Sequence, residues 1–158
     1  MAAQKPYEPE INLVSPNKNI APTTALVNQD GQLTIGGCLL ADLAERYGTP
    51  LYILDESTIR LTCRAYKDSL VKHYPGDSLA IYASKANSSI AISSIIRSEG
   101  LGLDAVSAGE LITAIQGGIK GKDIFLHGNN KSDAELLLAY KNDSTIVIDN
   151  EQEIVQLE

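Results

Sequence analysis

The stretch Leu101-Gly-Leu-Asp-Ala-Val-Ser-Ala-Gly-Glu110 predicts a complete junction between a strand and a helix. The first residues are apolar, as in a buried strand. Ser107 and Glu110 then have the spacing of a capping box, which marks the first turn of a helix. Gly100, directly before the run, is typical of the end of a preceding helix. The order of elements is therefore helix end, strand, capped helix.

The same order recurs along the second half of the chain. Strand-like runs begin near Leu79, Leu101, Ile124 and Thr145, which are 21 to 23 residues apart. Capping boxes or close variants follow at Ser107, Ser132 and Asn150. A short, regular period of strand and capped helix predicts parallel β/α units, and its regularity favours a β/α barrel over an open, doubly wound sheet.

The first half predicts different elements. Asn28-Gln-Asp-Gly31 is a turn signal that predicts a hairpin over residues 24–35. A helix is expected to end at Gly48, followed by a short strand over Leu51–Leu54. Ser57 is expected to cap the next helix. We expect residues 1–36 to form an N-terminal extension and β-hairpin, and residues 37–158 to form a partial barrel.

Composition excludes some functions. The net charge is -7 and the pI is about 4.8, which argues against nucleic-acid binding because phosphate contacts need a basic face. The first thirty residues contain no apolar segment of a signal peptide, and no membrane span is visible. Cys38 and Cys63 have no metal or redox spacing. Reduced thiols in a cytoplasmic protein, or a buried structural role, are expected.

The length suggests an incomplete barrel. A β/α barrel has eight strands and usually about 250 residues, whereas 158 residues supply four clear units. The chain ends at Glu158 in the middle of an amphipathic helix without a C-cap signal. We expect a fragment of a longer protein; a small domain with a frayed last helix is the alternative.

Polar residues collect where the predicted strands end, which is where barrel enzymes place their active sites. Lys85 follows an apolar run and is the candidate nucleophile, since a desolvated lysine can lose its proton. Asp104 needs a donor, for which Lys85 is the expected partner. His127 is either a base or a residue bonded to backbone, and Lys131 is expected to be solvated. No metal-ligand spacing is present.

Three motifs in register resemble the diaminopimelate decarboxylase family. They are Tyr82-Ala-Ser-Lys-Ala-Asn87, Gly102-Leu-Asp-Ala-Val-Ser-Ala-Gly-Glu-Leu111 and Phe125-Leu-His-Gly-Asn-Asn-Lys-Ser132. The resemblance covers the chain from about Ser15 to its end. This family is one of the alanine racemase-like enzymes that bind pyridoxal 5'-phosphate in a β/α barrel, with ornithine and arginine decarboxylases among its neighbours.

The resemblance implies a site and a reaction. Lys85 matches the lysine that bonds covalently to pyridoxal 5'-phosphate, and Asp104, His127 and Asn129 match positions on the cofactor side of the barrel. The implied reaction converts meso-diaminopimelate to L-lysine and carbon dioxide, the last step of lysine biosynthesis. A cytoplasmic homodimer is implied, in which the hairpin would join a second β-domain.

Several motifs of the resembled family are absent from the sequence. These are the glycine-rich phosphate loop, the Glu-Pro-Gly-Arg segment and the Cys-x-x-x-Asp segment that reaches across the dimer. The chain alone is therefore expected to be inactive. Two other functions stay open: decarboxylation of arginine, ornithine or carboxynorspermidine, and a non-catalytic role as a pyridoxal phosphate carrier or regulatory relative.

Overall fold

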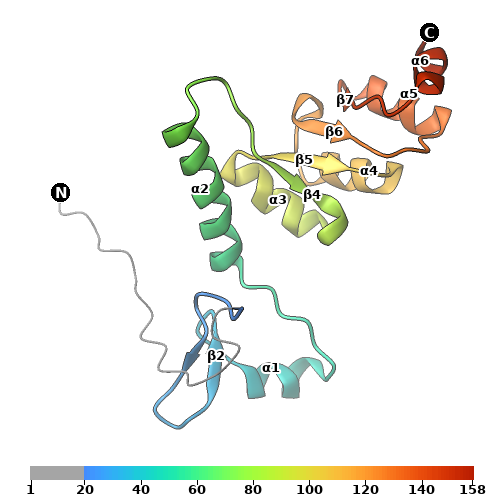
Figure 1. Ribbon diagram of the computed structural model, residues 1–158. Coiled ribbons are helices and arrows are strands. Elements are labelled where there is room, and N and C mark those ends of the chain that lie inside the picture. The colour runs from blue at the N-terminus through green and yellow to red at the C-terminus, as the bar shows by residue number, and fades with distance from the viewer. Residues whose placement is uncertain (1–19) are drawn as a thin grey trace. The chain divides into compact units, whose positions relative to one another are not determined.

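The computed structural model describes residues 20–158 (Figure 1). The chain divides into two compact bodies at Leu61 and Thr62. We call them the N-terminal body and the C-terminal body, and each is described by itself. The predicted division at residue 36 concerns the domains of a complete protein and stays a prediction.

The N-terminal body contains the predicted hairpin. Strands β1 (Leu26–Val27), β2 (Leu33–Ile35) and β3 (Cys38–Leu39) form an antiparallel sheet in that order. The side chain of Asn28 closes the first turn by accepting the backbone N–H groups of Asp30 and Gln32. Helix α1 (Leu40–Tyr47) follows and ends at Gly48, as predicted.

Two local predictions in this body are wrong. Residues 51–54 are not a strand, because no strand pairs with them among the described residues, and Tyr52 is 99% exposed. The cap of helix α2 (Glu56–His73) is Asp55, whose carboxylate accepts the backbone N–H of Thr58. Ser57 lies inside the first turn of α2 instead.

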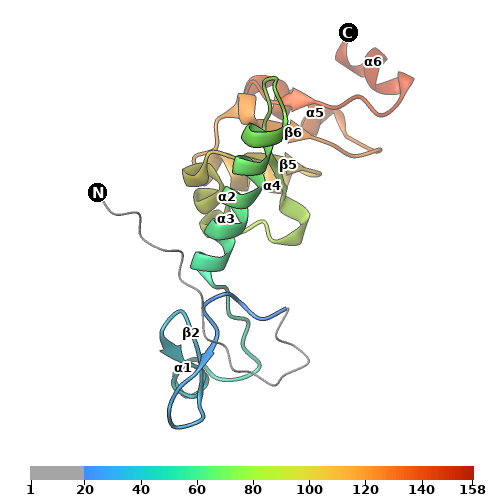
Figure 2. The same cartoon turned by 60° about the vertical axis from the view of Figure 1, so that its left-hand side comes forward.

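The C-terminal body contains a four-stranded parallel sheet (Figures 1 and 2). Its strands are β4 (Ile81–Ala83), β5 (Gly102–Ala105), β6 (Ile124–Leu126) and β7 (Thr145–Ile146), and they neighbour one another in chain order. The order never reverses, so right-handed crossovers place every connecting helix on the same face of the sheet. A doubly wound sheet needs a reversal, so the predicted part of a β/α barrel is confirmed.

Helices connect successive strands of this sheet. They are α3 (Ile90–Glu99), α4 (Ala108–Gln116) and α5 (Asp133–Lys141), with α6 (Glu151–Leu157) after β7 and the short 3-10 turns η1 (Ser84–Ala86) and η2 (Gly121–Asp123). Ser107, Ser132 and Asn150 cap their helices as predicted. Gly100 ends α3 in the left-handed conformation.

The core lies between the sheet and these helices. It is aliphatic, and its fully buried large side chains come from both layers: Ile96, Leu103, Leu111, Ile124 and Leu126. Strand β5 is buried on both faces, as expected of a strand in the interior of a parallel sheet. The buried residues of β5 and β6 hold the carboxyl ends of these two strands in place, and the candidate site is built from these ends and that of β4.

Candidate functional site

Lys85 lies just beyond the carboxyl end of β4. It is the middle residue of the turn η1 and is exposed. Within residues 20–158, no hydrogen bond or ion pair engages its amine. Lys85 was expected to pair with Asp104, and that prediction is wrong, because Asp104 contacts His127 instead. The amine is left available to an external partner.

The turn that carries Lys85 is held at both ends. Ser84, which is 1% exposed, places its hydroxyl oxygen 2.7 Å from the carbonyl oxygen of Asp104 and 2.7 Å from Glu110 Oε2. At the other end, the Tyr82 hydroxyl donates to the carbonyl of Asn87 over 3.2 Å. The backbone around Lys85 is therefore anchored although its side chain has no partner among the described residues.

Asp104 and His127 form a pair across neighbouring strands. Asp104 is in β5, and His127 directly follows β6. Asp104 Oδ1 contacts His127 Nδ1, and the two side chains are 19% and 39% exposed. A carboxylate only accepts hydrogen bonds, so Nδ1 carries the proton and Nε2 is the ring atom left to meet another group.

The loop after β6 turns back on itself. Gly128 has φ 122, a conformation that residues with side chains rarely adopt. Asn129 is exposed on this loop.

Lys131 is buried, so the prediction that it is solvated is wrong. Its ammonium lies 2.8 Å from Glu153 Oε1 and donates to the carbonyl of Gly128, and the Lys131 and Glu153 side chains are each 2% exposed. Glu153 also accepts the backbone N–H of Asp149 over 3.0 Å. A buried charge persists when an opposite charge and hydrogen bonds compensate it. The ion pair between Lys131 and Glu153 could not be predicted from the sequence, because the two residues are far apart in the chain.

Hydrogen bonding and burial shift three pKa values around these loops. The hydrogen bond from Lys131 lowers the pKa of Glu153 below its ordinary range, with the Asp149 N–H acting in the same direction. Hydrogen bonds from the backbone and side chain of Ser132 lower the pKa of Glu135. Burial raises the pKa of Tyr82. The two glutamates are thus stabilised as carboxylates.

Sequence reasoning did not predict that the glutamates in the first turns of the helices contact residues outside those turns. Glu110 was interpreted as part of a capping box with Ser107, but its carboxylate accepts the N–H of Val106 and faces Ser84. Among the described residues, Ser132 and Glu135 alone form the complete reciprocal box. The repeated Ser-x-x-Glu spacing identified these residues, but nothing in it indicated contacts to the preceding unit.

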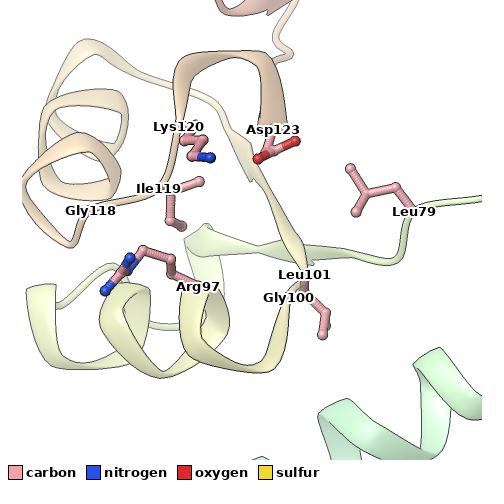
Figure 3. Close-up of a pocket in the computed structure, with 8 residues that line it drawn as sticks. All are labelled: Leu79, Arg97, Gly100, Leu101, Gly118, Ile119, Lys120 and Asp123. Atoms are coloured by element: carbon pink, nitrogen blue, oxygen red, sulfur yellow. The ribbon is translucent and has the colours of Figure 1, made fainter.

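A pocket of about 290 Å³ lies at the opposite ends of the strands (Figure 3). Leu79, Leu101 and Asp123 line it, and they precede β4, β5 and β6. Figure 3 shows the Arg97 side chain extending towards Gly118 at one side of the pocket. In β/α barrels this end of the strands serves stability, whereas the carboxyl ends carry the chemistry.

A family model described as pyridoxal-dependent decarboxylase, pyridoxal binding domain, matches residues 56–158. Similar curated proteins include the diaminopimelate decarboxylase of Synechocystis sp., 46% identical over 152 residues, and that of Bacillus subtilis, 45% identical over 136 residues. These alignments cover 90% and 85% of this chain. They cover 32% and 31% of the relatives, so the chain spans about a third of their length.

Solved structures of diaminopimelate decarboxylases are also similar to this chain in fold. A diaminopimelate decarboxylase from M. jannaschii in co-complex with L-lysine matches with a TM-score of 0.80 and 30% identity. The match covers 85% of this chain and 32% of that one.

Among residues 20–158, no helix has both the length and the apolar character that a bilayer crossing requires.

Proposed function

Because the chain belongs to the pyridoxal-dependent decarboxylase family, by its pyridoxal-binding domain, we propose that it carries the cofactor-bonding part of a diaminopimelate decarboxylase. Lys85 is the residue that bonds pyridoxal 5'-phosphate. The observation that carries the proposal is the pairing of an anchored turn with an amine that has no partner among residues 20–158.

The residues present fit this cofactor. An aldehyde reacts with an amine, and the Lys85 amine is exposed and holds no carboxylate partner among residues 20–158. The neighbouring strand ends carry the Asp104–His127 pair, whose ring is partly exposed. Asn129 adds an exposed amide on the same loop as His127. An amine, an imidazole and an amide suit an aromatic aldehyde.

Each site residue has a separate role in the proposal. Lys85 would supply the covalent attachment, His127, whose ring is oriented by Asp104, would contact the cofactor, and Asn129 would contribute a hydrogen bond. When bound, the cofactor supplies an electron sink for the carbanion left by loss of carbon dioxide. The protein's part is to fix the amine and the imidazole at two neighbouring strand ends.

The substrate of the complete protein is proposed to be meso-diaminopimelate, with L-lysine and carbon dioxide as products. The identity to the curated decarboxylases and the L-lysine complex of a similar structure support this choice. Action as a cytoplasmic homodimer is part of the same proposal. A decarboxylase for ornithine is a second candidate, supported by a lysine/ornithine decarboxylase from Vibrio vulnificus that is 25% identical with a TM-score of 0.65.

The site is tested by trapping the cofactor. The chain is incubated with pyridoxal 5'-phosphate, reduced with borohydride and digested, and the modified peptide is identified by mass spectrometry. We expect the adduct on Lys85, its loss in Lys85→Ala, and its retention in Lys120→Ala, which removes another exposed lysine. An adduct that maps mainly to a different lysine would overturn the proposal.

The reaction is tested separately. Carbon dioxide release is measured from meso-diaminopimelate, ornithine and arginine with the complete protein and with the 158-residue chain. We expect release from meso-diaminopimelate, and none from the 158-residue chain alone. Preference for ornithine or arginine would replace the substrate assignment, and an inactive complete protein that retains the Lys85 adduct would support a carrier or regulatory role.

A further inference from the structure

Three helices of the C-terminal body share a glutamate at the third helical position. These residues are Glu110 in α4, Glu135 in α5 and Glu153 in α6. Each accepts a backbone N–H from the loop just before its own helix: Val106 for Glu110, Ser132 for Glu135 and Asp149 for Glu153, over 2.8 to 3.0 Å. This contact alone is ordinary N-terminal capping.

The second contact of each glutamate reaches the preceding β/α unit. Glu110 Oε2 lies 2.7 Å from the Ser84 hydroxyl oxygen, and Glu135 Oε1 accepts the N–H of Ala108 over 3.0 Å. Glu153 Oε1 lies 2.8 Å from the ammonium of Lys131. The three glutamates therefore join the loops after β4, β5, β6 and β7 in series. Each glutamate thus contacts both its own helix start and the preceding unit, although the partner in that unit is a hydroxyl, a backbone N–H and an ammonium in turn.

From this series we infer that Glu110 is the positioning residue of Lys85, acting through Ser84. The inference rests on the proposed function of Lys85. Glu110 lies between the ends of β4 and β5, since one oxygen takes both the Val106 N–H and the Ser84 hydroxyl. Ser84 is the first residue of η1 and is buried, so the contact fixes the end of the turn from which Lys85 projects.

Loss of the carboxylate has a local consequence. Without Glu110 the Val106 N–H loses its acceptor, and Ser84 keeps only the carbonyl of Asp104. The amino-terminal end of η1 is then held by one contact, while its other end keeps the Tyr82 hydroxyl. A misplacement of a reacting group by about 1 Å can reduce a rate by about a hundredfold. We expect Glu110→Ala to slow adduct formation at Lys85 by about tenfold or more.

The test compares Glu110→Ala, Glu110→Gln and Glu135→Ala in the same chain. Glutamine can restore both bonds, because both fall on one oxygen of Glu110. Glu135→Ala removes a glutamate from the same helical position but leaves the contact to Ser84 intact. Three quantities are measured: the melting temperature, backbone hydrogen exchange over residues 84–87 without cofactor, and the rate of the borohydride-trapped adduct at Lys85.

We expect Glu110→Ala to speed exchange over residues 84–87 and to slow adduct formation, with Glu110→Gln close to the unmodified chain. Glu135→Ala is expected to lower the melting temperature without changing either Lys85 readout. Equal effects of Glu110→Ala and Glu135→Ala on adduct formation would overturn the inference, because the glutamate would then act only on stability. An unmodified chain that forms no adduct at Lys85 would instead overturn the proposed function, and the exchange data would still test the contact.

Discussion

Lys131 and Glu153 form an ion pair of 2.8 Å although 21 residues separate them, and both side chains are 2% exposed. The pair joins the loop after β6 to the first turn of α6. Water is excluded from both charges, so each depends on the other and on the Gly128 carbonyl and Asp149 N–H around them.

Removing one partner of this pair should cost more than removing both. Lys131→Met leaves the Glu153 carboxylate buried without its cation. Glu153→Gln leaves the Lys131 ammonium buried without its carboxylate. The double variant replaces both charges by neutral side chains of similar size. We expect each single variant to melt at a lower temperature than the double variant, measured by circular dichroism. Additive single and double effects would show that the two charges do not interact.

Acid should weaken the C-terminal body through Glu135 and Glu153. Both carboxyls have pKa values below their ordinary 4.5, so the stability they contribute is present above that value. It is lost as the pH falls through their lower values in the folded state. Urea titrations over this range should show a smaller fall in stability for Glu135→Gln than for the unmodified chain, with Glu151→Gln as an exposed control. Equal slopes in all three would contradict the prediction.

A second ion pair should stabilise the packing of α2 on α3. Arg64 donates from Nε and Nη2 to the two carboxylate oxygens of Glu99, over 2.7 and 2.9 Å, and the Glu99 side chain is 7% exposed. Arg64→Ala should cost about 1 to 2 kcal/mol in urea unfolding. Arg64→Lys keeps the charge but cannot make the paired contact, so an intermediate loss is expected. A loss equal to that of alanine would show that charge contributes nothing.

Two glycines of the C-terminal body should respond oppositely to alanine. A Cβ at Gly121 would lie 1.5 Å from the backbone oxygen of Asn142, so the neighbouring segment must shift, at a cost of about 1 to 3 kcal/mol or more. A Cβ at Gly109 would meet only Ser107 Oγ at 3.9 Å, within the first turn of α4. There alanine should be neutral or stabilise by up to about 1 kcal/mol. Melting temperatures of the two variants would check this contrast.

The Asp104 carboxylate should fix the tautomer of His127. Nitrogen NMR of the chain labelled at histidine is expected to show the proton on Nδ1 at a pH where the ring is neutral. In Asp104→Asn this preference should weaken, because the amide can present its NH₂ group as well as its oxygen. His73, at the end of α2, provides an internal reference in the same spectrum. An unchanged His127 tautomer would show that Asp104 does not control it.

The repeat of the C-terminal body could be predicted from sequence because its signals are local. Apolar strands, helix caps and terminal glycines each lie within a few residues, and all four strands formed where the pattern indicated. The strand predicted over Leu51–Leu54 failed for a physical reason. A strand needs a partner, and apolar residues alone do not supply one.

The contacts of the candidate site were less predictable because they join residues more than twenty positions apart. The pattern placed Lys85, Asp104 and His127 at the ends of three strands, and β4, β5 and β6 do lie side by side. The strand ends could not predict that Asp104 contacts His127 rather than Lys85. The order of the strands does not determine the direction in which each side chain points. Lys131 was misjudged for the same reason, since burial depends on Glu153 in the next unit.

The order of the sheet also bears on how the chain folds. Each of β5, β6 and β7 pairs with the strand that precedes it, and each helix-start glutamate reaches back to the preceding loop. The strand or loop that each new unit contacts has therefore already been synthesised when that unit leaves the ribosome. Because these contacts join only consecutive units, each new unit closes a loop of about one β/α unit rather than of the whole chain. The C-terminal body can grow during synthesis by adding one finished layer at a time, from Lys85 towards Glu153.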